Sequence, residues 1–134
     1  MPPSMKPGPS LAAIGQIALT VATIDRSVAF YRDALGMPLL FQAPPGLAFF
    51  NCGGIRLMLS QPEAGFTPGG GSVLYFRVTD IEGTHAALMA RGVSFVDTPH
   101  LITKMPDHDL WMTFFKDPDG NGLALMEEKT SASP

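Results

Sequence analysis

Residues 111–127, WMTFFKDPDGNGLALME, contain two short apolar runs on either side of a Pro-Asp-Gly sequence. The runs at 112–115 and 123–126 are typical of short buried β-strands. Between them the proline presets φ, Asp119 can bond its own backbone, and Gly120 tolerates a positive φ. The segment therefore predicts a β-hairpin, and the rest of the chain is interpreted around it.

The first half of the chain predicts a β-α-β-β-β module over residues 13–60. Alternating apolar residues predict a strand over 14–21, and Thr23 or Asp25 can cap a helix over 25–35. A glycine at the next position is placed to end that helix. Three short strands follow, separated by glycine and proline turn signals, at 37–41, 48–51 and 55–60.

The same order of elements returns after a linker of glycine and proline at 61–71. In residues 72–128, a strand at 72–78 precedes a helix over 80–91 that Asp80 can cap, a strand at 93–96, and the hairpin. The repeat predicts an α+β fold of two βαβββ modules related by a pseudo-twofold axis, with eight strands and both helices on the convex side of curved mixed sheets.

Composition limits the classes of partner. The chain has 134 residues and a net charge of −3, and it has no basic run, which argues against nucleic acid and anionic membrane surfaces. No apolar stretch approaches the ~20 residues that span a bilayer. A single cysteine, Cys52, excludes an internal disulfide and favours the reducing cytoplasm. Residues 1–12 predict a disordered proline-rich tail, and residues 129–134 a second tail.

Four phrases, in this order and spacing, resemble the vicinal oxygen chelate superfamily, the group of glyoxalases, bleomycin-resistance proteins and extradiol dioxygenases. They are IGQIALTV, IDRSVAFYRDALGM, LYFRVTDIEGTHAALMARGV and FFKDPDGNGLALME. The similarity covers about residues 12–128. It implies two curved sheets that form a cleft for a small molecule, and a homodimer as the common assembly.

In metal-dependent members of that superfamily, four positions on the first and last strands of the modules hold a divalent cation. The resemblance places these positions at Gln16, Met58, Val73 and Ala124. A Zn²⁺, Ni²⁺ or Fe²⁺ site with open positions needs about three nitrogen or oxygen donors, and only Gln16 offers one. We therefore predict no cofactor, and a divalent metal is disfavoured.

Other side chains on the cleft strands are candidates for contact with a ligand. Tyr75 and Arg77 share a face with Val73, and an arginine suits a carboxylate or phosphate group. An ion pair between modules or subunits is an equal alternative for Arg77. Trp111 has an apolar body and one polar tip, so it can orient a ligand or belong to the core. The predicted ligand-binding residues are Gln16, Met58, Val73, Tyr75, Arg77, Trp111 and Ala124.

The two modules differ mainly at residues 97–109, which predict a long loop that closes over the cleft. This segment holds His100 and His108 beside carboxylates, and a histidine in that setting can transfer protons near neutral pH. Solvated loop histidines are the plain alternative. A replacement metal site from His100, His108 and Asp107 is a further one.

Three functions remain in order of preference. The first is a protein that binds a small aromatic or amphiphilic molecule in an apolar cleft, with the family metal site degenerate. The second is a lyase or isomerase that uses His100 or His108 for proton transfer. The third, a metal-dependent glyoxalase or dioxygenase, lacks three donors. Whether the chain is an enzyme, and which ligand it takes, stays open at this point.

Overall fold

The structure is a computed structural model that describes residues 12–62 and 72–130. Most of the predicted tail at 1–12, most of the linker at 61–71, and the end of the tail at 129–134 lie outside the described residues. Lys129 and Thr130, which were predicted to begin a tail, instead belong to the last strand. That strand continues because β7 supplies a partner for both residues.

The first module contains one helical segment and four strands. The helical segment begins as α1 (Ile24–Val28) and continues as a π-helical stretch, η1 (Ala29–Ala34). Thr23 is the N-cap but makes no side-chain hydrogen bond, and the Ile24 amide instead donates to Gln61 Oε1 at 2.7 Å. The strands are β1 (Gln16–Thr20), β2 (Leu39–Ala43), β3 (Leu47–Cys52) and β4 (Ile55–Ser60).

The second module repeats this order with one longer helix. In α2 (Ile81–Ala90), Asp80 is the N-cap and its carboxylate accepts from the Gly83 amide at 3.0 Å, as predicted. The strands are β5 (Val73–Arg77), β6 (His100–Lys104), β7 (His108–Lys116) and β8 (Gly122–Thr130). The predicted α+β architecture of two βαβββ modules is confirmed.

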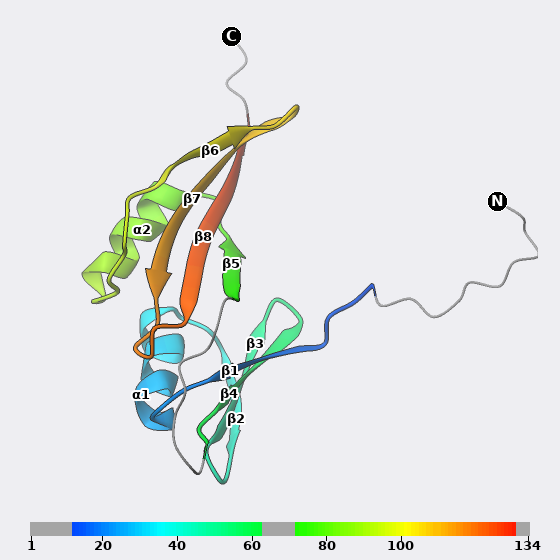
Figure 1. Cartoon of the computed structure of the whole chain (residues 1–134), viewed down its shortest axis with the longest axis vertical. Coiled ribbons are helices and arrows are strands. Elements are labelled where there is room, and N and C mark those ends of the chain that lie inside the picture. Colours follow the sequence, from blue (N-terminus) through cyan, green and yellow to red (C-terminus); the bar gives the residue numbers. More distant parts are fainter. Residues whose placement is uncertain (1–11, 63–71, 131–134) are drawn as a thin grey trace, which may run out of the picture.

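Each module forms one four-stranded mixed sheet with the same topology. Sheet A has the order β1-β4-β3-β2 and sheet B the order β5-β8-β7-β6, and in both the first strand pairs parallel with the last. The helices of both modules lie on the same side of the molecule, and the opposite faces of the two sheets are open (Figure 1). We call these open faces the concave faces.

Alternation along the strands separates the core from the concave faces. In β4, Leu57 and Leu59 are buried against the helices, whereas Arg56 and Met58 point to the other face. In β8, Leu123 and Leu125 belong to the core, and Met126 lies on the concave face. This two-residue period follows from the pleat of a strand.

The second module departs from the prediction between α2 and β7. Residues 93–96 make only a single bridge, between Phe95 and Phe115, so the predicted strand there is wrong. Val93 is buried, and the Phe95 ring packs on Phe115 with centroids 4.8 Å apart. Residues 93–96 therefore contribute apolar side chains to the core and do not form a strand.

Residues 97–109, predicted as a loop, instead form β6, the segment that leads into it and the turn into β7. The leading segment begins at Asp97, whose Oδ1 accepts from Thr113 Oγ1 at 2.7 Å and from the Phe114 amide at 2.9 Å. From His100 onward the chain pairs with β7. The segment is therefore an edge strand of sheet B, and it does not close over the cleft.

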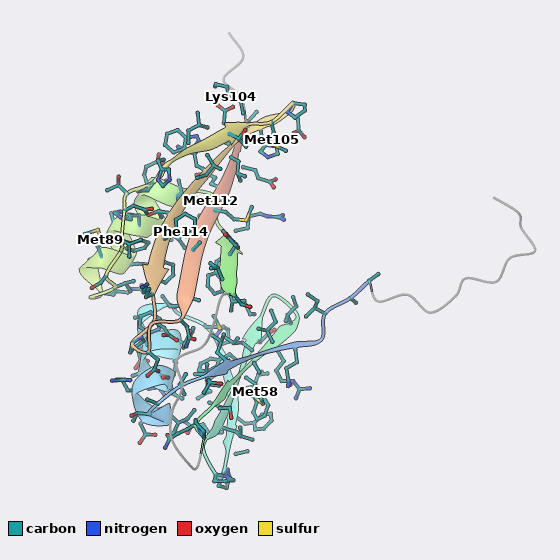
Figure 2. The ribbon with its side chains drawn as sticks, in the orientation of Figure 1. Met58, Met89, Lys104, Met105, Met112 and Phe114 are labelled. Carbon is teal, nitrogen blue, oxygen red and sulfur yellow. The ribbon has the colours of Figure 1, made fainter. Side chains whose placement is uncertain are left out.

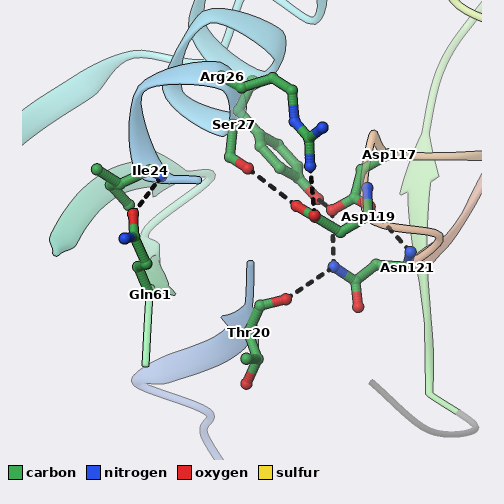
Figure 3. Close-up of polar contacts among 9 residues, drawn as sticks. Thr20, Ile24, Arg26, Ser27, Gln61, Asp117, Asp119 and Asn121 are labelled. Atoms are coloured by element: carbon green, nitrogen blue, oxygen red, sulfur yellow. Dashed lines mark hydrogen bonds and ion pairs between the residues drawn. The ribbon is translucent and has the colours of Figure 1, made fainter. Parts of the chain in front are cut away.

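A buried polar network joins the two modules through the turn between β7 and β8 (Figure 3). Asp117 Oδ1 accepts from the amides of Asp119 and Asn121, each at 2.9 Å, so Asp117 and not Asp119 organises this turn. Asp117 Oδ2 also accepts from the Tyr31 hydroxyl at 2.8 Å. Burial and the neighbouring Asp117 raise the pKa of Tyr31 far above its ordinary value.

The side chain of Asp119 reaches across to α1 instead. It accepts from Arg26 at 2.6 Å and from the Ser27 hydroxyl at 3.2 Å. Asn121 completes the link by donating to the Thr20 carbonyl at 3.2 Å. The first module's helix and first strand are therefore both tied to one turn of the second module, which fixes the angle between the sheets.

Candidate functional site

A pocket of about 320 Å³ lies at the seam between the two sheets. One wall is residues 73–76 of β5, the edge strand of sheet B, whose only partner among the described strands is β8. Both faces of β5 contribute, which is expected where the unpaired edge of a strand borders a cavity. The other wall comes from β1, β3 and β4 of sheet A, and its residues are Ile17, Cys52, Ile55 and Leu57.

The lining of this pocket is apolar and uncharged. Leu74 and Phe76 extend from the core into it, and the lining residues whose side chains carry a polar group are Tyr75 and Cys52. Burial raises the pKa of the Cys52 thiol. Because the thiolate is the nucleophilic form, this thiol serves as an apolar surface and not as a reactive group.

Two of the predicted ligand residues, Val73 and Tyr75, border this pocket. Tyr75 lies across from Ala124, and its ring meets Phe114 edge-on with centroids 6.1 Å apart. Phe114 is also paired with Ala124 in register, so both rings flank that alanine, which has no exposed surface. Arg77 follows on the same face of β5 and is exposed.

The first-module residues Gln16 and Met58 lie together on the concave face of sheet A (Figure 2 labels Met58). Gln16 Nε2 donates to Met58 Sδ at 3.8 Å. Of the four positions that the resemblance assigns to a divalent ion, Val73 and Ala124 carry no donor atoms and Met58 carries a thioether. These residues do not fit a hard or borderline divalent cation, and the described part of the chain holds no group of three His, Cys, Asp or Glu residues placed to bind one.

Trp111 lies on the face opposite to the concave one, so its predicted place in the cleft is wrong. It is paired with Glu127, whose carboxylate accepts from the Ile81 amide at the start of α2. The Lys129 ammonium sits 4.2 Å from the centroid of the indole. The register of β7 therefore turns Trp111 toward the helix, while its neighbours in sequence face the cleft.

The structure separates the two histidines that the sequence grouped together. His100 pairs with Met112, whereas His108 lies four residues earlier on β7, which is about 13 Å along a strand. His108 Nδ1 contacts Asp107 Oδ1 at 2.7 Å near the tip of the β6–β7 hairpin, and Asp107 is 86% exposed. A metal site made from His100, His108 and Asp107 is therefore not formed.

Sequence reasoning missed most of the seam pocket. Phe114 and the pocket residues of sheet A were assigned to strands but not to a site, since their role depends on how the two sheets meet. The available signal for Phe114 was the alternation of side chains along β7. A residue an odd number of positions from Trp111, such as Phe114, must lie on the opposite face of the strand.

Comparison with known proteins agrees with this architecture. The chain matches the Glyoxalase/Bleomycin resistance protein/Dioxygenase superfamily over residues 13–125, and it belongs to that superfamily. It is 29% identical over 126 residues to the protein YraH of Bacillus subtilis, covering 82% of this chain and 94% of that protein.

Solved structures share the fold. A lactoylglutathione lyase from Agrobacterium tumefaciens is 23% identical, with a TM-score of 0.72 over 88% of this chain and 95% of that one. A superfamily member from Sphaerobacter thermophilus is 25% identical, with a TM-score of 0.72 over 88% and 98% of the two chains. None of the helices in the described part of the chain is long and apolar enough to cross a membrane.

Proposed function

We propose that this chain binds a small, uncharged or amphiphilic aromatic molecule in the seam pocket between its two sheets. The observation that carries the proposal is the apolar pocket of about 320 Å³ between β5 and sheet A. This volume lies at the lower end of the range for small-molecule sites, which are largely apolar with a few polar groups that fix orientation.

The free edge of β5 and the Tyr75 hydroxyl supply those polar groups. Backbone amides and carbonyls on an unpaired strand edge keep their hydrogen-bonding capacity, and residues 73–76 border the pocket. An aromatic ring that carries one hydroxyl or carbonyl group satisfies both the apolar walls and this polar edge. Arg77, further along β5, is placed to favour an acidic substituent that extends beyond the pocket.

Among the described residues, the lining of the seam pocket includes neither of the histidines that the second hypothesis requires. The pair of His108 and Asp107 stands near the tip of the β6–β7 hairpin, and His100 lies on the far edge strand of sheet B. Binding without turnover is therefore our proposal, and a lyase or isomerase activity through these histidines has no observation in its favour. We also propose that no divalent cofactor is held, because Gln16 alone among the four family positions has a nitrogen or oxygen donor.

We propose further that the chain is a cytoplasmic homodimer. The concave faces carry exposed apolar side chains, among them Phe41 and Tyr75, each 48% exposed. The edge strands leave backbone groups available for pairing. Sedimentation velocity at micromolar concentration is expected to give a species of twice the 14.3 kDa chain mass, and a 14.3 kDa species would contradict the dimer.

The pocket itself is tested by titrating the full chain with 1-naphthol in a calorimeter. Val73→Phe and Ile55→Phe each place a larger side chain at a pocket wall, and we expect either to weaken binding at least tenfold, which is about 1.4 kcal/mol. Met89→Phe is the matched control, because Met89 is 53% exposed on α2. Thermal unfolding of each variant verifies the fold. Equal affinity in all variants, or no binding to the wild-type chain, refutes the proposed site.

A further inference from the structure

A row of side chains with soft donor atoms crosses the concave face of sheet B. The β6–β7 register places His100 opposite Met112, and the β7–β8 register places Met112 opposite Met126. Directly opposed residues share a face and have Cβ atoms about 4.5–5.5 Å apart. One imidazole and two thioethers are therefore neighbours on three adjacent strands.

The row lies on the open side of the sheet. The residues on either side of Met112 in sequence face the helix layer: Thr113 donates to Asp97, and Trp111 packs against the core. Met112 and Met126 are half-buried and His100 is exposed, so an ion can enter from solvent. Figure 2 shows Met112 and Phe114 together on β7, and the Phe114 ring gives the row an apolar border.

The hydrogen bond of His100 prepares its second nitrogen for a metal. Nδ1 lies 2.7 Å from the Thr98 carbonyl oxygen, and a carbonyl only accepts. Nδ1 therefore carries the proton of the neutral ring, and Nε2 keeps its lone pair. Histidines that bind metals commonly donate their other ring N–H to a carbonyl or carboxylate in this way, which fixes the tautomer.

The donor set selects the kind of ion. Two thioethers are soft donors that suit Cu(I), and an imidazole also binds copper, whereas Mn²⁺ and Mg²⁺ prefer oxygen ligands. Arg77 continues the row on the other side of Met126, and Glu128 lies two residues beyond Met126 on the same face of β8. These two opposite charges offset each other, so the sulfur atoms and not the surrounding charge favour a soft monovalent ion.

We propose that His100, Met112 and Met126 form a binding site for a soft monovalent metal ion, Cu(I) or its redox-inert analogue Ag(I). The site shares no residue with the four family metal positions. It lies one row beyond Ala124 on the sheet, and it is independent of the aromatic-ligand pocket proposed above.

The test titrates the full chain carrying Cys52→Ser, which serves as the wild type of this comparison because the free Cys52 thiol would bind Ag⁺ more tightly than a thioether. The titration uses Ag⁺ in a buffer free of chloride and thiols, and follows heat and the ¹³C-methyl signals of labelled methionines. We expect one equivalent to bind and to shift the Met112 and Met126 methyl signals. Met112→Leu, Met126→Leu and His100→Phe are each expected to weaken binding at least tenfold. Because Leu and Met have similar volumes, the methionine variants are expected to fold, and circular dichroism verifies this.

Met58→Leu and Met89→Leu are the matched controls, because Met58 lies on sheet A and Met89 on the outside of α2. Both are expected to bind Ag⁺ as the wild type does. Anaerobic competition with a chromophoric Cu(I) chelator repeats the comparison with copper. The proposal is overturned if the wild type does not bind Ag⁺, if the double variant Met112→Leu/Met126→Leu binds as tightly as the wild type, or if Met58→Leu loses as much affinity as Met112→Leu.

Discussion

Removing one hydroxyl group from the network between the modules tests how the two sheets are held together. Tyr31 is fully buried, and its hydroxyl donates to Asp117 at 2.8 Å across the junction between α1 and the β7–β8 turn. Tyr31→Phe keeps the ring and its edge-on contact with Phe30 at 5.2 Å. The substitution therefore isolates the hydrogen bond from the packing.

The expected loss of stability follows from the kind of bond removed. A hydrogen bond to a charged acceptor contributes about 1.5–3 kcal/mol. Asp117 keeps its other donors, the Asn121 side chain and two turn amides, so we expect the lower half of that range. With a urea m-value of about 2 kcal/mol/M for a chain of this size, the midpoint of unfolding falls by about 1 M.

Urea unfolding monitored by far-UV circular dichroism measures this shift. Tyr75→Phe is the control for loss of a tyrosine hydroxyl, because Tyr75 is 48% exposed and substitutions at such positions usually change stability by less than about 0.5 kcal/mol. If the two variants unfold at the same urea concentration, the Tyr31 hydrogen bond does not hold the two modules together. It then also does not fix the position of the two sheets that border the seam pocket.

Three further results are expected. Asp80→Ala removes the carboxylate that accepts from the Gly83 amide and should cost about 1 kcal/mol in urea unfolding; an unchanged midpoint would contradict this capping role. Gly120→Ala should cost about 1–2 kcal/mol because φ is +82° there, whereas Gly15→Ala, in open space without a positive φ, should have little effect. Since the pKa of Tyr31 is raised on folding from 10.0, wild-type stability should fall by up to about 1.4 kcal/mol per pH unit above pH 10, and Tyr31→Phe should lack this part of the fall.

Local chemistry was sufficient to predict most of the fold. The cap at Asp80, the positive φ of Gly120 and the alternation in β1 depend on neighbours within a few residues, and the structure agrees with each. Asp119 was predicted to bond the backbone of the turn, but Asp117 does so, and the side chain of Asp119 contacts α1 instead. Asp119 pairs with Arg26, which lies far away in the sequence.

The site was less predictable because it depends on register and on how the sheets meet. Trp111 and Met112 are equally compatible with a cleft until the partner strand is known, and pairing of Trp111 with Glu127 decides that it faces the helix. The segment at 97–109 has few strong strand formers, and its pairing with β7 is a tertiary effect. Cys52 and Leu57 become pocket residues only because β5 lies beside them.

The presence of alanine at position 124 connects the two proposals. The resemblance makes this one of the four metal positions, and the family often has a glutamate there. Here the alanine leaves space that the rings of Tyr75 and Phe114 cover, and no surface of it remains exposed. A charged group beneath two aromatic rings would be desolvated without a partner, so the aromatic cover and the loss of the donor depend on each other. Once this position is apolar, the family site has no ligand on β8, and aromatic contacts take its place beside the sulfur atoms of the adjacent row. Restoring the carboxylate alone, as in Ala124→Glu, is therefore expected to destabilise sheet B without creating a site for a divalent ion.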